Sequence, residues 1–148
     1  MPTIRLKTRV SGSYQVVFSR FDRDLFEALK PIGMQLEIVT FDGSKVGDRV
    51  HLRFGSPINT DWISDIIEEG GDEDHLYFID KGIKLPWPLK SWSHKHIVAQ
   101  DGINSCFIID EMTYDTGNFA FSALIKPFLF ASFLPRKRQY QRYFGSVG

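Results

Sequence analysis

One short segment of the sequence concentrates the side chains that could carry out chemistry. Trp92, His94 and His96 occupy alternate positions, so their side chains share one face of a strand. Ser93 and Lys95 lie between them and suit the face that meets water. We therefore expect the tryptophan and both histidines to point inward. A buried imidazole needs a partner for its N–H, and a neighbouring strand can supply one.

The candidate partner is Asp110, in the strand-like segment that follows. A carboxylate and an imidazole without water around them can move protons on a bound substrate, so His94 and Asp110 are candidate catalytic residues. The same pair could instead be a satisfied polar cluster that fixes strand register. Metal binding by His94 and His96 with Asp110 is a third alternative. No cysteine pair or helical histidine pair supports it and Trp92 crowds the site, so we predict no metal.

The residues that lie opposite one another depend on the hairpin between these two segments. A three-residue loop of 100–102 puts Trp92 opposite Asp110 and His96 opposite Cys106. A two-residue loop of 101–102 shifts the pairing by one, so that Trp92 faces Glu111. We favour the longer loop, which turns five side chains inward: Cys106, Ile108, Asp110, Met112 and Tyr114. It leaves Phe107 and Ile109 facing outward, where together they could form a patch for self-association.

The elements that position this segment follow from hydrophobic periodicity. Residues 4–8 alternate as a first strand, and an apolar stripe from Tyr14 to Leu29 predicts helix. Ser13 can cap that stripe and Asp22 can divide it into two short helices. Strands are then predicted at 34–38, 50–54, 62–68, 76–80, 91–99 and 103–114. Consecutive strands without crossover helices pair antiparallel, which predicts an α+β domain with six to seven strands.

The chain ends in a predicted long helix. Leu129, Phe133, Tyr140 and Phe144 form one stripe, separated by four, seven and four positions. Pro127 suits the first turn of such a helix, whereas Pro135 should kink or interrupt it. The basic residues between 136 and 142 fit a solvated helix face.

The composition is that of an ordinary folded chain. With 148 residues, of which 43% are hydrophobic and 24% charged, the sequence suits a single domain over residues 1–148. Lysine and arginine number 18, as do aspartate and glutamate, so the formal net charge is zero. A dedicated nucleic-acid binder normally carries a basic excess. We therefore predict no nucleic-acid partner.

Two features bear on the compartment. Met1–Val10 contains no apolar run of signal-peptide length, and the single cysteine, Cys106, suits a reducing compartment. The apolar stretch Asn118–Leu134 contains Lys126 and Pro127 and falls short of the roughly 20 residues that a bilayer requires. We predict a cytoplasmic protein in which this stretch is a buried helix and no segment spans a membrane.

Several spaced motifs resemble a bacterial subgroup of the START/Bet v 1-like superfamily, also called SRPBCC. They are the segments Phe21–Phe26, Trp62–Ile66, Phe78–Asp80, Trp92–His96 and Asp110–Tyr114, the last followed by Gly117. That subgroup has a Trp-x-His-x-His strand and an Asp-x-x-x-Tyr strand. The sequence departs from it where Asp115-Thr116 replaces the usual proline and where Pro135 interrupts the last helix. The resemblance spans about Ile4 to Phe144.

The resemblance implies a helix-grip fold, in which a curved antiparallel sheet wraps around the C-terminal helix and two short helices follow the first strand. It also implies a cavity between sheet and helix for a hydrophobic or aromatic small molecule, with no cofactor. Strand parity and the helix stripe predict the residues that line the cavity: Phe54, Trp62, Trp92, His94, Met112, Leu129 and Phe133. The alternative is a polyketide cyclase- or dehydratase-like enzyme in which Asp110 and His94 transfer protons without a metal. A homodimer through outward apolar residues is a further expectation.

Overall fold

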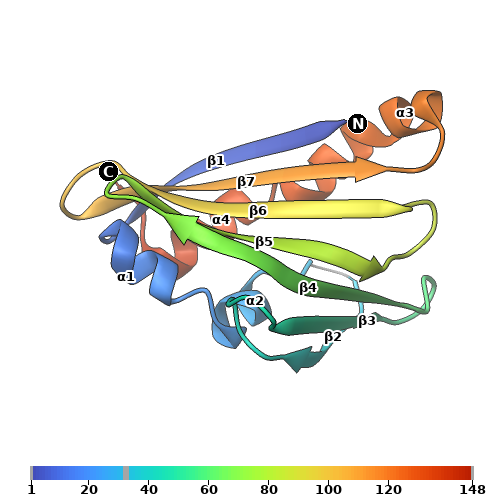
Figure 1. Cartoon of the computed structure of the whole chain (residues 1–148), viewed down its shortest axis with the longest axis horizontal. Coiled ribbons are helices and arrows are strands. Elements are labelled where there is room, and N and C mark those ends of the chain that lie inside the picture. The colour runs from blue at the N-terminus through green and yellow to red at the C-terminus, as the bar shows by residue number, and fades with distance from the viewer. Residues whose placement is uncertain (1, 32–33, 148) are drawn as a thin grey trace.

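The computed structural model describes residues 2–31 and 34–147, in which seven strands form one antiparallel sheet (Figure 1). The strands are β1 (Thr3–Ser11), β2 (Leu36–Phe41), β3 (Arg49–Phe54), β4 (Thr60–Gly71), β5 (His75–Lys84), β6 (Ser91–Gln100) and β7 (Ser105–Asp115). The helices are α1 (Tyr14–Ser19), α2 (Arg23–Ala28), α3 (Phe119–Phe133) and α4 (Arg136–Phe144).

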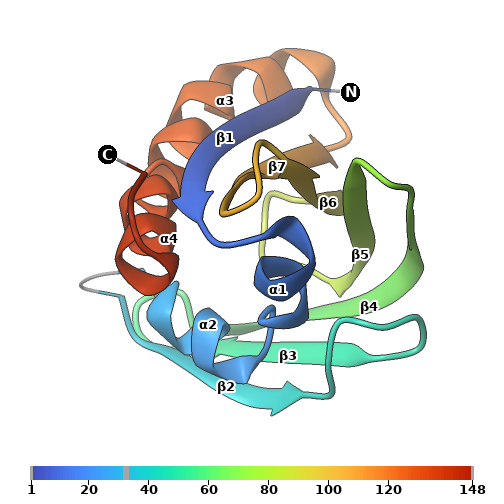
Figure 2. The same ribbon diagram turned by 90° about the vertical axis from the view of Figure 1, so that its left-hand side faces the viewer.

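The sheet has the order β1-β7-β6-β5-β4-β3-β2 and curls strongly. After β1 the chain crosses through α1 and α2 to β2 at the opposite edge and then fills the sheet by successive hairpins. Figure 2 shows α3 and α4 on the hollow side of the curl, with α1 and α2 near one end of it. This arrangement confirms the predicted α+β helix-grip fold.

Local signals place the two short helices as the sequence predicts. The Ser13 side chain accepts a hydrogen bond from the backbone N–H of Val16, and the Asp22 carboxylate accepts one from Leu25. Both are helix N-caps, which satisfy backbone donors that have no partner within the helix. Asp22 therefore divides the apolar stripe into α1 and α2.

The C-terminal helical segment differs from the expectation in two respects. Helix α3 begins at Phe119, capped by Asn118, so Pro127 lies inside the helix rather than in its first turn. The stretch is also not a buried helix, because Ser122 is the only buried residue among those of α3. Large apolar side chains on its outer side are exposed: Phe119 by 84%, Leu124 by 73% and Phe128 by 73%.

By length and composition, the stretch Phe119–Phe144 is apolar enough to cross a membrane, although only 6% of its most apolar window is buried within the protein. Helix α3 ends where Pro135 was expected to interrupt the helix, and α4 begins at Arg136. Helix α4 packs on β1, and its Tyr140 is fully buried.

The hairpin between β6 and β7 has neither of the registers considered from the sequence. Trp92 pairs with Tyr114, His96 with Asp110, and Gln100 with Cys106. Beyond the Gln100–Cys106 pair the chain turns through residues 101–105, a connection longer than either predicted loop. Because the true register differs from the favoured one by an even number of residues, each strand still presents the expected face inward. Cys106, Ile108, Asp110, Met112 and Tyr114 are all buried.

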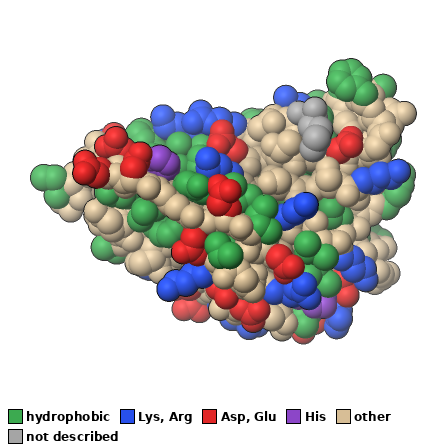
Figure 3. All heavy atoms as spheres, viewed as in Figure 1, with side chains coloured by type: hydrophobic (Ala, Val, Ile, Leu, Met, Phe, Trp, Pro, Cys, Tyr) green, Lys and Arg blue, Asp and Glu red, His purple; other side chains and the backbone are tan. Residues whose placement is uncertain are grey.

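The predicted outward patch is not present. Ile109 is buried at 7% exposure, and the ammonium group of Lys7 lies over the ring of Phe107, 4.1 Å from its centroid. Figure 3, which looks onto the outer face of the sheet, shows acidic, basic and apolar side chains mixed over this surface.

The interior consists of two apolar clusters with a polar group between them. One cluster joins the end of β6 at Val98 to α1, α2 and Tyr140. The other surrounds Trp92, Met112 and Tyr114. His94 and His96 lie between Trp92 and Val98 on the same buried face of β6. The sheet thus holds two imidazoles between two regions that exclude water.

Candidate functional site

A cavity of about 720 Å³ lies between the concave face of the sheet and the C-terminal helices. Its walls are largely apolar and carry many aromatic rings, while a polar end contains Asp80, His94, His96 and Arg136. Trp87 and Phe128 line the cavity and are also exposed, by 86% and 73%, so they lie at its rim. A concave, mostly apolar space with a few converging polar groups is typical of a small-molecule site.

Six of the seven residues predicted to line the cavity do so. They are Phe54, Trp62, Trp92, His94, Leu129 and Phe133. Met112 does not line it: its side chain is fully buried in the apolar cluster around Trp92. Trp92 contacts Trp62 edge to face, with ring centroids 5.0 Å apart, and stacks on Phe133 at 5.5 Å. These rings form a connected wall from the sheet to α3.

His94 and Asp110, predicted to be neighbours, form a buried hydrogen-bonded pair. Nε2 of His94 lies 2.8 Å from Oδ1 of Asp110, diagonally across β6 and β7 rather than from the opposite position. Burial and the neighbouring His96 lower the pKa of His94 to about 4, in spite of the hydrogen bond to Asp110. Burial alone would raise the pKa of Asp110, but the His94 hydrogen bond and nearby positive charges lower it to about 2.

The directions of these two pKa shifts determine the protonation of the pair near neutral pH. Asp110 is a carboxylate and His94 is a neutral imidazole. Nε2 of His94 therefore carries the N–H and donates a hydrogen bond to Oδ1 of Asp110. Nδ1 of His94 is then a lone-pair acceptor. In pairs of this kind a carboxylate orients an imidazole and selects its tautomer.

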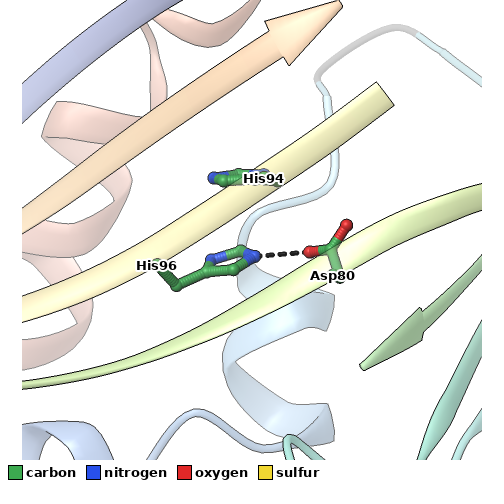
Figure 4. A group of neighbouring side chains, drawn as sticks. All are labelled: Asp80, His94 and His96. Atoms are coloured by element: carbon green, nitrogen blue, oxygen red, sulfur yellow. Dashed lines mark hydrogen bonds and ion pairs between the residues drawn. The ribbon is translucent and has the colours of Figure 1, made fainter. Parts of the chain in front are cut away.

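A second histidine–carboxylate pair lies beside the first and was not predicted. Nε2 of His96 lies 2.6 Å from Oδ2 of Asp80 on β5, and the rings of His94 and His96 are stacked with centroids 3.7 Å apart (Figure 4). Burial opposes the ionisation of Asp80, but the His96 hydrogen bond holds the pKa of its carboxyl below the ordinary value. Asp80 was present in the sequence motif Phe78–Asp80, but nothing there indicated its partner.

Helix α4 closes the polar end of the cavity. The hydroxyl of Tyr140 donates to Oδ1 of Asp110 at 3.2 Å, and Nη1 of Arg136 lies 3.6 Å from the same oxygen. The Arg136 side chain is only 17% exposed, so the expectation of a solvated face is wrong for this residue. The signal in the sequence was its position four residues before Tyr140, which places both on the same helix face.

The cluster leaves polar atoms without partners. Among the described residues, Nδ1 of His96 and Oδ2 of Asp110 are buried without a hydrogen bond. Nδ1 of His96 lies 3.8 Å from Oδ1 of Asp110, too far for a normal hydrogen bond. A buried polar atom without a partner costs about 1–3 kcal/mol, so the cluster is not arranged for stability alone.

Asp80, His94 and His96 are also the donor types that a transition metal takes, and one potential ligand atom from each lies within 4.8 Å of the others. The two imidazole planes, however, are inclined by only 17° and stacked. The lone pair of an imidazole nitrogen lies in the plane of its ring, and these two planes are nearly parallel and separate, so a single ion would lie outside the plane of at least one ring. Ligation would require a ring to rotate and the His96–Asp80 hydrogen bond to break.

Cys106 is not a candidate nucleophile. Its side chain is buried and faces Gln100 across the hairpin rather than His96. Burial raises the pKa of its thiol to about 11, which keeps it protonated.

The fold is that of solved Bet v 1-like proteins. Norcoclaurine synthase from Thalictrum flavum, as a point mutant with a transition-state analogue, superposes with a TM-score of 0.69 over 94% of this chain and 90% of that chain, at 18% identity. The same enzyme in complex with dopamine and hydroxybenzaldehyde gives 0.67 over 99% and 89%, at 17% identity. An uncharacterised protein from Bacillus thuringiensis gives 0.67 over 98% and 100%, at 14% identity.

No family model matches the sequence, and no curated protein matches it. The structural matches confirm the predicted resemblance to the Bet v 1-like superfamily at the level of fold. At these identities they carry no ligand or activity over to this chain.

Proposed function

We propose that this chain, as a single domain, binds a small apolar or aromatic molecule in the cavity between its sheet and its C-terminal helices. The supporting observation is a space of about 720 Å³ whose walls are aromatic and aliphatic and whose polar groups converge at one end. Dopamine and hydroxybenzaldehyde, held by the norcoclaurine synthase neighbour, are themselves aromatic molecules with polar substituents. Binding in such a cavity is favourable because it removes the apolar surface of a ligand from water.

Two measurements test this proposal. Native mass spectrometry of protein purified without detergent should reveal a bound small molecule. Titration with Nile red, a neutral dye that fluoresces in apolar surroundings, should saturate at one site. The Leu52→Trp variant adds a ring to the cavity wall and should weaken dye binding about tenfold or more.

The control introduces the same side chain on the other face of the same strand. Arg53 is exposed, and its side chain pairs with Asp61 on the outer surface, so Arg53→Trp should leave dye affinity unchanged. Absence of any saturable binding by the unmodified protein would refute the proposal, as would equal effects of the two variants.

One observation favours a second candidate function, proton transfer on the bound molecule. His94 is a neutral imidazole oriented by a carboxylate, and it lines the cavity. A base of this kind can take a proton from a bound substrate while Asp110 stabilises the imidazolium that forms. If the chain is an enzyme, His94→Gln should abolish turnover of a substrate, and the loss of turnover should exceed the loss of ligand affinity.

A further inference from the structure

The polar end of the cavity indicates which chemical class of ligand it binds. This inference rests on the binding function proposed above. We infer that the ligand carries a protonated amine, which lies between the carboxylate of Asp80 and the ring of His94. Three features of the described residues carry this inference: the free acceptors, the charge of the cluster and the rings around it.

Asp80 offers an unused acceptor to the cavity. Its Oδ2 accepts the hydrogen bond from His96, whereas its Oδ1 has no donor among the described residues and is not among the fully enclosed atoms. The side chain is 13% exposed and lines the cavity. An ionised carboxylate accepts at both oxygens, so Oδ1 still requires a donor.

His94 offers the second acceptor. Its Nε2 is committed to Asp110, which leaves a lone pair on Nδ1. A ring nitrogen of each histidine and a carboxylate oxygen of Asp80 lie within 4.8 Å of one another (Figure 4). Because the N–H bonds of an ammonium group point in tetrahedral directions, a nitrogen about 2.8 Å from each of two acceptors bridges a separation of about 4.6 Å. An ammonium group has up to three donors and can serve both acceptors, whereas a single hydroxyl could satisfy only one.

The charge of the cluster favours a cation. Asp80 and Asp110 are carboxylates, whereas Arg136 is the cation that contacts Asp110 and His94 is neutral. Among these four groups the balance lacks one positive charge, which a cationic ligand would supply. A carboxylate ligand would add a third negative charge to a site shielded from water.

Aromatic rings border the same position. The ring of Trp92 lies 6.3 Å from that of His94, and the ring of Phe78 stacks on His96 at 4.3 Å. Ring faces attract cations, and their edges and faces cover the apolar body of a ligand. An aryl-alkylamine combines both requirements.

The experiment compares three ligands that share one ring system and differ in the polar group: tryptamine, tryptophol and indole-3-propionate. Calorimetric titrations near pH 7 with a chelator present should show tryptamine binding about 10- to 100-fold more tightly than tryptophol, because a charged hydrogen bond contributes more than a neutral one. Asp80→Asn should remove this preference while the affinity for tryptophol stays the same. Asp80→Glu, which keeps the charge, should retain most of it.

Tryptophol affinity and circular dichroism report whether the Asp80→Asn variant is folded. Equal affinities for the three ligands in the unmodified protein, or tightest binding of indole-3-propionate, would overturn the inference while the binding function stands. Absence of binding by all three and by Nile red would overturn both. Tight binding of Zn²⁺ alone that is lost in Asp80→Asn would assign these side chains to a metal and also overturn the amine.

Discussion

The stacked imidazoles predict how the stability of this protein depends on pH. The pKa of His94 is about 4 in the folded chain, against 6.5 for an unperturbed histidine. In the unfolded chain His94 takes up a proton below about pH 6.5, whereas in the native state it stays neutral. Stability is therefore full above pH 6.5 and falls as the pH drops towards 4.

The magnitude follows from the size of this shift. A difference of one pKa unit corresponds to about 1.4 kcal/mol, so His94 removes about 3 kcal/mol from the free energy of unfolding between pH 6.5 and 4. Asp110, whose pKa is lowered to about 2, removes more only below about pH 4. Measurements above about pH 4 therefore separate the contribution of His94 from that of Asp110.

Urea unfolding at a series of pH values between 4.5 and 7.5 measures this slope. His94→Gln keeps an N–H that can donate to Asp110 but cannot titrate, so its slope should be shallower by close to one proton. His75→Gln removes a histidine whose side chain is 35% exposed and serves as the control. If the His94→Gln slope matches that of the unmodified protein, or if NMR shows His94 titrating near pH 6.5, the described environment of this ring is wrong.

Three further predictions test the same architecture. Asp110→Asn leaves the mostly enclosed Arg136 without its counter-charge and should lower the free energy of unfolding by about 3–5 kcal/mol, whereas Asp101→Asn at the exposed hairpin should cost under about 1 kcal/mol. Tyr140→Phe removes a hydrogen bond to a carboxylate and should cost about 1–3 kcal/mol in urea unfolding, with an unchanged circular dichroism spectrum. Leu124→Gln on the exposed side of α3 should change stability by less than about 0.5 kcal/mol. Sedimentation of that variant beside the unmodified protein tests the homodimer expected from sequence, and a shared monomeric mass at all concentrations would contradict it.

Strand periodicity was sufficient to predict the antiparallel α+β class and the inward face of β6, because the side chains of a strand alternate whatever its neighbour does. The helix-grip fold itself was predicted from the family resemblance. The same reasoning failed for the pairing of Trp92. Turn residues restrict loop length without determining it, and a longer turn through residues 101–105 was as compatible with Asp101 and Gly102 as the shorter ones. The prediction that His94 and Asp110 are neighbours was nevertheless correct, because the two side chains meet diagonally rather than from opposite positions.

The remaining parts of the site depend on contacts between distant elements. Within α4 the signal for Arg136 was its spacing of four residues from Tyr140, and this spacing does not reveal that Asp110 on β7 is its partner. Helix α3 was expected to be buried because it is densely apolar. Its apolar side chains are distributed all round the helix, and one sheet can cover only one side of it.

The energetics of the polar cluster bear on what it is for. Buried charges cost several kcal/mol to remove from water, and well-packed apolar residues can replace such clusters with little loss of stability. Here the cost is only partly offset, because Nδ1 of His96 and Oδ2 of Asp110 lack partners among the described residues. Asp80 and His94, which have free hydrogen-bond acceptors, instead line a cavity large enough for a small molecule. A cluster arranged only to hold β6 against β7 would turn its spare acceptors towards backbone donors, whereas these acceptors are placed where a bound molecule can reach them.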